Sequence, residues 1–258
     1  MTYSRQFELN PAVSTATANR DADRRATTRT RASPGGCMPI LCFHHIGPGG
    51  AEFDVTPEEL ADLLEHLVAA GTEIVPPSVA PSGSDDRVSF IFDDGYASTL
   101  EHALPLMEKF GVSFGMAVVP GLLSDEERPS WLPHSSTEFT TVKGVRNWLE
   151  AGGELLGHSY SHVKLTALAT STVRFELTRE LDAYRGMGVP RPQSFAYPFG
   201  DQDDRVRAVV AEAGYRTAFG TGSGDGSPFN LHRITFRRWK LGPILERNWP
   251  YLVEEEND

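Results

Sequence analysis

The sequence is poor in the features that define several broad classes of protein. It has two cysteines in 258 residues, too few for a disulfide scaffold, and their spacing is not that of a CxxC metal or redox motif. It has no apolar run of the roughly 18 residues that a membrane-spanning helix needs. Lysine and arginine (24) are fewer than aspartate and glutamate (35), which gives a net charge of −11. We therefore expect no membrane or nucleic-acid partner, and a buried free thiol at Cys42, which lies in an apolar run.

The two ends of the chain differ in composition from the rest. Residues 1–36 hold six arginines against three acidic residues, show no apolar periodicity and lack the apolar core of a secretion signal. We expect this segment to be a disordered tail and the protein to be cytoplasmic, with an organelle-targeting leader as the alternative. The acidic residues of 251–258 are expected to form a second solvated tail. The remaining residues, 37–250, have the size of one domain, and nothing in them indicates an oligomeric state.

Between the tails, signals for strands and helices alternate along the chain. Short apolar runs typical of buried parallel strands occur at 39–43, 88–92, 113–119, 154–157, 194–197, 217–219 and 233–236. Helices are expected from Thr56, where an N-cap, a first-turn proline and acidic residues coincide, to Gly71, and at 96–110, 142–151, 171–186 and 203–213. About seven β/α units without internal repeats indicate a parallel barrel or a doubly wound sheet.

Both architectures place their functional sites at the carboxyl ends of the strands, and polar residues stand at several of these ends. Asp93 and Asp94 follow the second predicted strand, where adjacent carboxylates are costly unless water or a cation compensates them; a helix-capping turn is the alternative. His158 and His162 follow the fourth predicted strand. If this segment is helical, the i,i+4 spacing places both imidazoles on one face, where they suit a divalent metal ion, although such pairs also arise by chance.

A sharp turn, Tyr-Pro-Phe-Gly at 197–200, follows another strand, and its backbone N–H groups can stabilise an oxyanion. In this order, Phe-Asp-Asp-Gly at 92–95, His-Ser-x-x-His at 158–162 and this turn resemble the first three motifs of the polysaccharide deacetylases, the NodB-homology carbohydrate esterases. The resemblance covers nearly all of residues 38–240. The segment Phe-Ala-Tyr-Pro at 195–198 is similar to a branch that includes biofilm-polysaccharide deacetylases. The resemblance implies a distorted (β/α)7-type barrel in a single catalytic domain.

The resemblance also implies a role for each residue of the site. Asp93 matches the catalytic base, which takes a proton from a metal-activated water. The N–H group of Phe199, two residues after Tyr197 in the same turn, would help to hold the oxyanion. The metal would be zinc in the first place, with cobalt, nickel or manganese as alternatives, and its ligands would be Asp94, His158 and His162. The implied reaction removes an N-acetyl or related acyl group from an amino sugar or a polysaccharide.

Two positions depart from the pattern of the family. Its best-known branch has an arginine in the third motif, paired with the base, where this sequence has Ala196. Arg233 is a candidate replacement, or else a surface arginine at the barrel rim. The fifth motif of the family, Leu-x-His, is present only as Leu231-His232, without the spacer. His232 is the first candidate for the general acid and His44 the second, and the alternative for each is a structural histidine.

Two other functions stay open. One is hydrolysis of another C–N bond, an amide or formamide, in a small metabolite or sugar conjugate, which the lack of a secretion signal favours. The other is a non-catalytic sugar-binding relative, which predicts a broken metal triad, whereas all three residues are present here. For sugar stacking, Trp131 is the best candidate, because it lies in the loop after the strand at 113–119.

Overall fold

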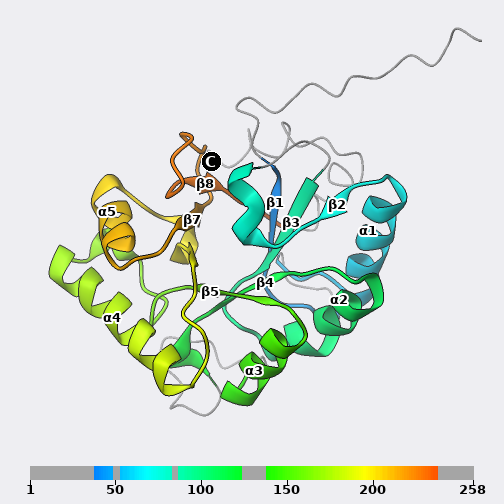
Figure 1. Ribbon diagram of the computed structural model, residues 1–258, viewed down its shortest axis with the longest axis horizontal. Helices are drawn as coiled ribbons and strands as arrows, with labels where there is room; N and C mark the ends of the chain where they lie inside the picture. The colour runs from blue at the N-terminus through cyan, green and yellow to red at the C-terminus, as the bar shows by residue number, and fades with distance from the viewer. Residues whose placement is uncertain (1–37, 49–52, 83–86, 124–137, 238–258) are drawn as a thin grey trace, which may run out of the picture. The chain divides into compact units, whose positions relative to one another are not determined.

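A computed structural model describes the chain over residues 38–48, 53–82, 87–123 and 138–237. The expected tails at 1–36 and 251–258, and Trp131, lie outside the described residues. The described residues form one α/β domain, in which parallel strands form a barrel with helices around it (Figure 1). In this view α1 and α2 lie at the right of the barrel, α3 below it, and α4 and α5 at the left.

The strands are β1 (Ile40–Phe43), β2 (Glu73–Ile74), β3 (Arg87–Phe92), β4 (Gly115–Val118), β5 (Glu154–Gly157), β6 (Ser194–Ala196), β7 (Thr217–Gly220), β8 (Leu231–His232) and β9 (Ile234–Thr235). The helices are α1 (Pro57–Ala69), α2 (Leu104–Phe110), α3 (Val142–Glu150), α4 (Thr170–Gly186) and α5 (Asp204–Glu212), with shorter turns η1 (Pro77–Ser82), η2 (Thr99–Ala103), η3 (Pro120–Leu122), η4 (Leu165–Ala167) and η5 (Pro198–Gly200). The strands pair in parallel in the order β8-β7-β6-β5-β4-β3-β1-β9, and β2 pairs with β3 outside this order.

The last two strands are halves of one extended run, residues 231–235. Its first half, β8, pairs with β7, and its second half, β9, pairs with β1. Between the halves, the Arg233 N–H donates to the carbonyl oxygen of Gly220 at 2.8 Å, and after β9 the Phe236 N–H donates to that of Cys42 at 2.7 Å. The run therefore joins the two ends of the sheet order, so that eight strands take seven places around a nearly closed barrel. This confirms the expected barrel.

Alternate residues of each strand face the inside of the barrel, because side chains of an extended chain point to opposite faces in turn. One buried apolar cluster takes a residue from nearly every strand of the ring: Ile40, Ile91, Ala117, Leu156, Ala196, Phe219 and Leu231. The residues between them, such as Leu41, Phe90 and Met116, belong to a second cluster under the helices. Two residues beyond the inner cluster, the same alternation reaches Cys42, Asp93, His158 and Arg233. A polar layer thus lies on the apolar core at the carboxyl ends of the strands.

Helix α1 shows how the sequence fixes the outer layer. The Thr56 hydroxyl accepts from the Glu59 N–H at 3.1 Å, and the Glu59 carboxylate accepts from the Thr56 N–H at 2.9 Å, which forms a capping box. The apolar stripe of α1 is buried, and burial of each leucine contributes about 1.5–3 kcal/mol. Its four buried leucines are Leu60, Leu63, Leu64 and Leu67. Val68, expected in the same stripe, is instead 45% exposed, because it lies at the edge of the buried face.

The remaining differences from the expected elements are local. The helix expected at 96–110 begins as the π-helical turn η2, in which the Leu104 N–H donates to the Thr99 carbonyl, because Pro105 has no N–H group to continue an α-helical pattern. The strand expected at 233–236 is the interrupted run described above. Strand β2 was not expected, since two residues carry no periodicity.

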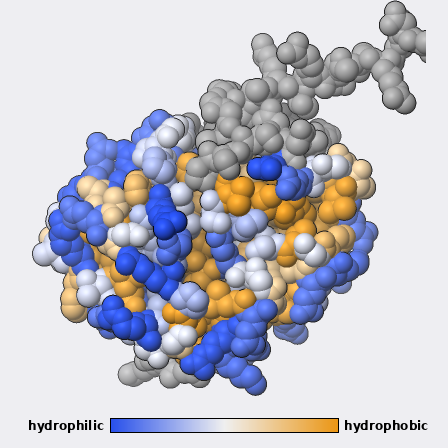
Figure 2. Space-filling view, viewed as in Figure 1, coloured by the Kyte–Doolittle hydropathy of each residue, from blue (hydrophilic) through white to orange (hydrophobic). Residues whose placement is uncertain are grey.

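Hydrophilic and hydrophobic residues are unevenly spread over the face shown in Figure 2. Hydrophilic residues follow the outer rim, where α3, α4 and α5 lie, and hydrophobic residues gather toward the centre and the side of α1 and β2. Among the described residues, no helix combines the length and the apolar character that would let it cross a bilayer.

Candidate metal and base site

Asp93, the first residue after β3, lies inside the barrel with 1% of its surface exposed. Its Oδ2 accepts a hydrogen bond from Nη1 of Arg233, which is itself 2% exposed. Nη2 of Arg233 donates to the Tyr197 carbonyl oxygen at 2.6 Å, and Nη1 also lies 3.1 Å from Cys42 Sγ. The alternative reading of Arg233, a surface salt bridge at the rim, is therefore wrong. Cys42 is a buried free thiol, as expected.

The negative charge of Asp93 is stabilised by the Arg233 guanidinium. Burial opposes ionisation of Asp93, but the Arg233 guanidinium, helped by His158, lowers the pKa of Asp93 below its ordinary value. Oδ1 of the same carboxylate is buried and has no hydrogen-bond partner among the described residues. Asp93 thus combines a stabilised negative charge with one oxygen that is available to accept a proton.

Asp94, His158 and His162 converge beside this ion pair. Asp94 Oδ1 lies 3.4 Å from Nε2 of His158 and 3.2 Å from Nε2 of His162. Burial lowers the pKa of His158, but the carboxylates of Asp93 and Asp94 outweigh burial and raise that pKa above its ordinary value. Burial lowers the pKa of His162 to about 4. One carboxylate oxygen and two imidazole nitrogens within 4.8 Å of one another form a donor set of the kind that holds zinc and similar ions.

The hydrogen bonds of His158 show that these residues fit a cation. Its Nδ1 lies 2.6 Å from the carbonyl oxygen of Ala196, which can only accept, so the proton of the neutral ring belongs on Nδ1. The lone pair of Nε2 then faces the carboxylate of Asp94, and two acceptors repel each other unless a proton or a cation lies between them. Asp94 Oδ1 is also buried without a hydrogen-bond partner among the described residues. A divalent ion would satisfy both atoms.

The backbone at the site is strained. Within the described residues, four residues other than glycine have a positive φ: Asp94 (68°), Ser159 (62°), His162 (53°) and Phe199 (59°). All four belong to the three sequence motifs, and conformations of this kind cost on the order of 1–3 kcal/mol each. Strand alternation would point the Asp94 side chain away from the barrel interior. The positive φ of Asp94 ends this alternation, and its carboxylate lies beside His158. The helix considered for 158–162 is wrong: the segment is a loop that reverses at Ser159 and His162.

The sequence-based site omitted two buried carboxylates that lie behind the histidines. Glu180 of α4 is fully buried and accepts from the His158 N–H at 2.5 Å, and burial raises the pKa of Glu180 to about 7. Glu176, one turn earlier, accepts from the N–H and the hydroxyl of Ser161. The signal was present, because both glutamates interrupt the apolar stripe of α4 that includes Leu177 and Tyr184.

The two candidate acids lie in different surroundings. His44 continues the inward alternation of β1, and its Nε2 lies 4.0 Å from Asp93 Oδ2, with 26% of its side chain exposed. His232 precedes the inward-pointing Arg233 and therefore points to the other face of its strand. Its Nδ1 lies 2.9 Å from the Gly222 carbonyl oxygen. The structure thus brings His44, the second candidate, to the base, and holds His232 against a loop.

Tyr197 and Phe199 reach the site in different ways. The ring of Tyr197 is buried and its hydroxyl donates to the Phe229 carbonyl oxygen at 2.9 Å, so only its own carbonyl, through Arg233, contacts the site. Phe199 is 61% exposed, and the centroid of its ring lies 4.6 Å from that of His162. Phe199 therefore presents its ring to the space beside His162.

Comparison with known families decides the relationship of the chain. The sequence profile of the polysaccharide deacetylases matches residues 80–218, more than half of the 258-residue chain. The chain belongs to the polysaccharide deacetylase family. Enzymes of this family remove acetyl groups from sugar polymers and generally use a divalent metal ion. The Bacillus subtilis protein YxkH, named as a polysaccharide deacetylase, is 22% identical over 208 residues, which are 76% of this chain and 70% of the relative.

Solved structures share the fold of this polysaccharide deacetylase family member. IcaB from Ammonifex degensii matches with a TM-score of 0.72 and 19% identity, over 83% of this chain and 97% of that chain. The Streptococcus pyogenes deacetylase PplD, determined in complex with acetate, matches with a TM-score of 0.71 and 19% identity, over 84% and 98% of the two chains. At these identities, the likeness establishes the common barrel.

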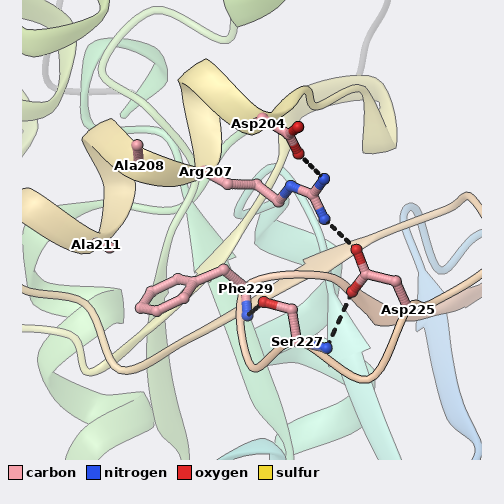
Figure 3. Close-up of a pocket in the computed structure, with 7 residues that line it drawn as sticks. All are labelled: Asp204, Arg207, Ala208, Ala211, Asp225, Ser227 and Phe229. Carbon is pink, nitrogen blue, oxygen red and sulfur yellow. Dashed lines mark hydrogen bonds and ion pairs between the residues drawn. The ribbon is translucent and has the colours of Figure 1, made fainter.

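A surface pocket of about 400 Å³ lies between α5 and the loop at 221–230 (Figure 3). Arg207 of α5 pairs there with Asp204 and with Asp225, and Asp225 also accepts from the Ser227 N–H at 2.9 Å. The charged groups of this pocket thus satisfy one another. None of the residues that line it belongs to the candidate site.

Proposed function

We propose that this chain is a metal-dependent deacetylase that hydrolyses the N-acetyl group of an amino sugar within a polysaccharide. The observation that carries the proposal is the side-by-side placement of two units: a donor set formed by Asp94, His158 and His162, and the buried pair of Asp93 and Arg233. One unit suits a divalent cation and the other suits a general base. The preference for a sugar polymer rests on membership of the polysaccharide deacetylase family.

Each remaining residue has a distinct task in this mechanism. A bound divalent cation, with zinc as the first choice, supplies Lewis acidity that lowers the pKa of a water molecule and polarises an acyl carbonyl. Asp93 accepts the proton of the attacking water on Oδ1, while Arg233 keeps Oδ2 in place and the carboxylate ionised. The Phe199 N–H donates to the acyl oxygen as negative charge develops on it. As the C–N bond breaks, the His44 imidazole donates a proton to the leaving amine.

The proposal predicts metal-dependent release of acetate from a sugar. Purified protein is stripped with a chelator, reloaded with zinc or cobalt, and incubated with chito-oligosaccharides, N-acetylated monosaccharide conjugates and simple N-acyl amines. We expect free acetate from the oligosaccharides only after reloading, because the water would otherwise keep its ordinary pKa. Equal activity of stripped and reloaded protein would contradict the metal dependence. Product from the small amides alone would instead favour hydrolysis of another C–N bond.

The choice between the two histidines can be tested with a matched pair of variants. We expect His44→Gln to lower kcat on an N-acetyl sugar by about 10²–10⁴-fold, the usual contribution of a general acid. The same variant should keep most of its activity on an activated aryl acetate, because that leaving group needs no proton. We expect His232→Gln to change neither rate appreciably, since His232 contacts a loop carbonyl. A large loss of amide hydrolysis in His232→Gln, with His44→Gln unaffected, would reverse the assignment.

A further inference from the structure

Helix α4 carries two carboxylates on the face that packs against the barrel. Glu176 and Glu180 are 7% and 0% exposed, and they lie one helical turn apart among the buried Val173, Leu177 and Tyr184. Buried carboxylates are rare in apolar surroundings, because each must recover its lost hydration through hydrogen bonds. The donors that these two carboxylates find therefore indicate what α4 holds in place.

The loop that carries the histidines supplies donors to both carboxylates. Glu180 Oε1 accepts from the His158 N–H at 2.5 Å, and its Oε2 accepts from the Tyr215 hydroxyl at 2.7 Å. Glu176 accepts from the Ser161 N–H at 3.1 Å and from the Ser161 hydroxyl at 2.7 and 2.8 Å. Helix α4 is thus hydrogen-bonded to the loop at its first residue, His158, and at its fourth, Ser161.

The conformation of this loop requires such support. Residues 158–162 form no regular helix or strand, and Ser159 and His162 both have a positive φ. Within the loop, the His162 N–H donates to Ser159 Oγ at 3.0 Å. A strained conformation persists when its surroundings over-determine it. The two carboxylates supply restraints from outside the loop, together with the Ala196 carbonyl beside His158 Nδ1 and the Gly121 N–H, which donates to the Tyr160 carbonyl at 2.9 Å.

We propose that Glu176 and Glu180 are positioning residues, which hold the His158–His162 loop so that both imidazoles face Asp94 and thereby set the metal affinity of the site. This inference rests on the proposed function, because it takes these side chains to bind a divalent ion. Neither glutamate touches the ion or the substrate in this arrangement. They act through the backbone of His158 and through Ser161.

The test measures metal binding directly. Zinc affinity is determined by competition with a chromophoric chelator, and the ligand geometry by the visible absorption of bound cobalt, for the wild type, Glu180→Leu, Glu180→Gln and Glu176→Ala. We expect Glu180→Leu and Glu176→Ala to bind zinc about 10–100-fold more weakly, the usual effect of removing a residue that holds a metal ligand in place. Both substitutions should also change the absorption spectrum of bound cobalt. Glu180→Gln should bind almost as the wild type does, because its amide oxygen can still accept from the His158 N–H.

A control separates positioning from general stability. Thr217→Val removes a buried hydrogen bond from the Thr217 hydroxyl to Ser194 Oγ at 2.9 Å. This bond joins the amino-terminal ends of β6 and β7, whereas the site lies at the carboxyl ends of the strands. We expect this variant to melt at a lower temperature with unchanged zinc affinity and cobalt spectrum. If Glu180→Leu does not fold, Glu176→Ala and Glu180→Gln decide the outcome.

The outcomes separate this inference from the proposed function. Wild-type affinity and an unaltered cobalt spectrum in the folded carboxylate variants overturn the positioning role and leave the proposed function standing. Equal weakening in Glu180→Gln and Glu180→Leu also overturns it, since the charge would then matter rather than the hydrogen bond. A wild-type protein that binds neither ion overturns the proposed function, and the inference with it.

Discussion

We expect Asp93→Asn to keep its metal ion and to lose about 10²–10⁴-fold in kcat, the usual contribution of a general base. Asparagine matches aspartate in shape but cannot accept the proton of the attacking water. The residue lies next to the donor set without belonging to it, so the affinity for zinc should change little. Steady-state kinetics on an N-acetylated oligosaccharide, together with metal analysis of the same sample, measures both quantities.

The neighbouring carboxylate supplies a matched control for this experiment. Asp94→Asn makes the same chemical change one residue later, at the atom that lies within 3.4 Å of both imidazole Nε2 atoms. We expect this variant to lose its zinc and its activity together. Full activity in Asp93→Asn would remove Asp93 from the role of base, and normal metal content in Asp94→Asn would refute its assignment as a ligand.

Arg233→Met should destabilise the metal-free protein by about 3–5 kcal/mol, because it leaves the buried charge of Asp93 without its partner. Both side chains of the pair are 2% exposed, so water cannot replace the guanidinium. Urea unfolding of the wild type and the variant, at one pH and with chelator present, gives the difference in the free energy of unfolding. A loss below about 1 kcal/mol, the range of exposed pairs, would contradict this account of the pair.

The double variant Asp93→Asn/Arg233→Met tests the cause of that loss. If the uncompensated charge is responsible, the double variant should be more stable than Arg233→Met alone, because asparagine carries no charge to bury. If lost packing of the arginine side chain is responsible, the second substitution should restore nothing. The comparison therefore distinguishes electrostatics from packing at the centre of the site.

Much of the barrel follows from local signals in the sequence. The N-cap of α1 and the run at 154–157 locate their elements closely, because both depend on a few adjacent residues. The interior layer also follows from alternation, which leads from Ile91 to Asp93 and from Leu156 to His158. The interruption at Arg233 could not be predicted, because it arises where one run pairs with two different neighbours at once.

The details of the site were harder to predict from the sequence. The i,i+4 spacing of His158 and His162 is compatible with a helix, but the segment is a loop, because Ser159 and His162 adopt the left-handed backbone conformation. Hydrogen bonds from this loop to α4 help to hold that conformation, and they join residues far apart in the sequence. The partial Leu-His motif ranks His232 before His44 as the candidate acid, and the choice between them stays a prediction. Strand alternation contains the relevant information, since His232 and Arg233 are neighbours and cannot both point inward.

The run at 231–235 also has a consequence for the order in which the protein matures. Asp93 is made early during synthesis, and its counter-ion arrives 140 residues later, on the run that joins the two ends of the sheet. Before this run leaves the ribosome, we expect the sheet to stay open and the Asp93 carboxylate to stay hydrated, because its counter-ion is missing. We expect the dry interior and a competent base to arise in one late step, so that a ribosome-bound chain ending before residue 231 remains protease-sensitive and inactive.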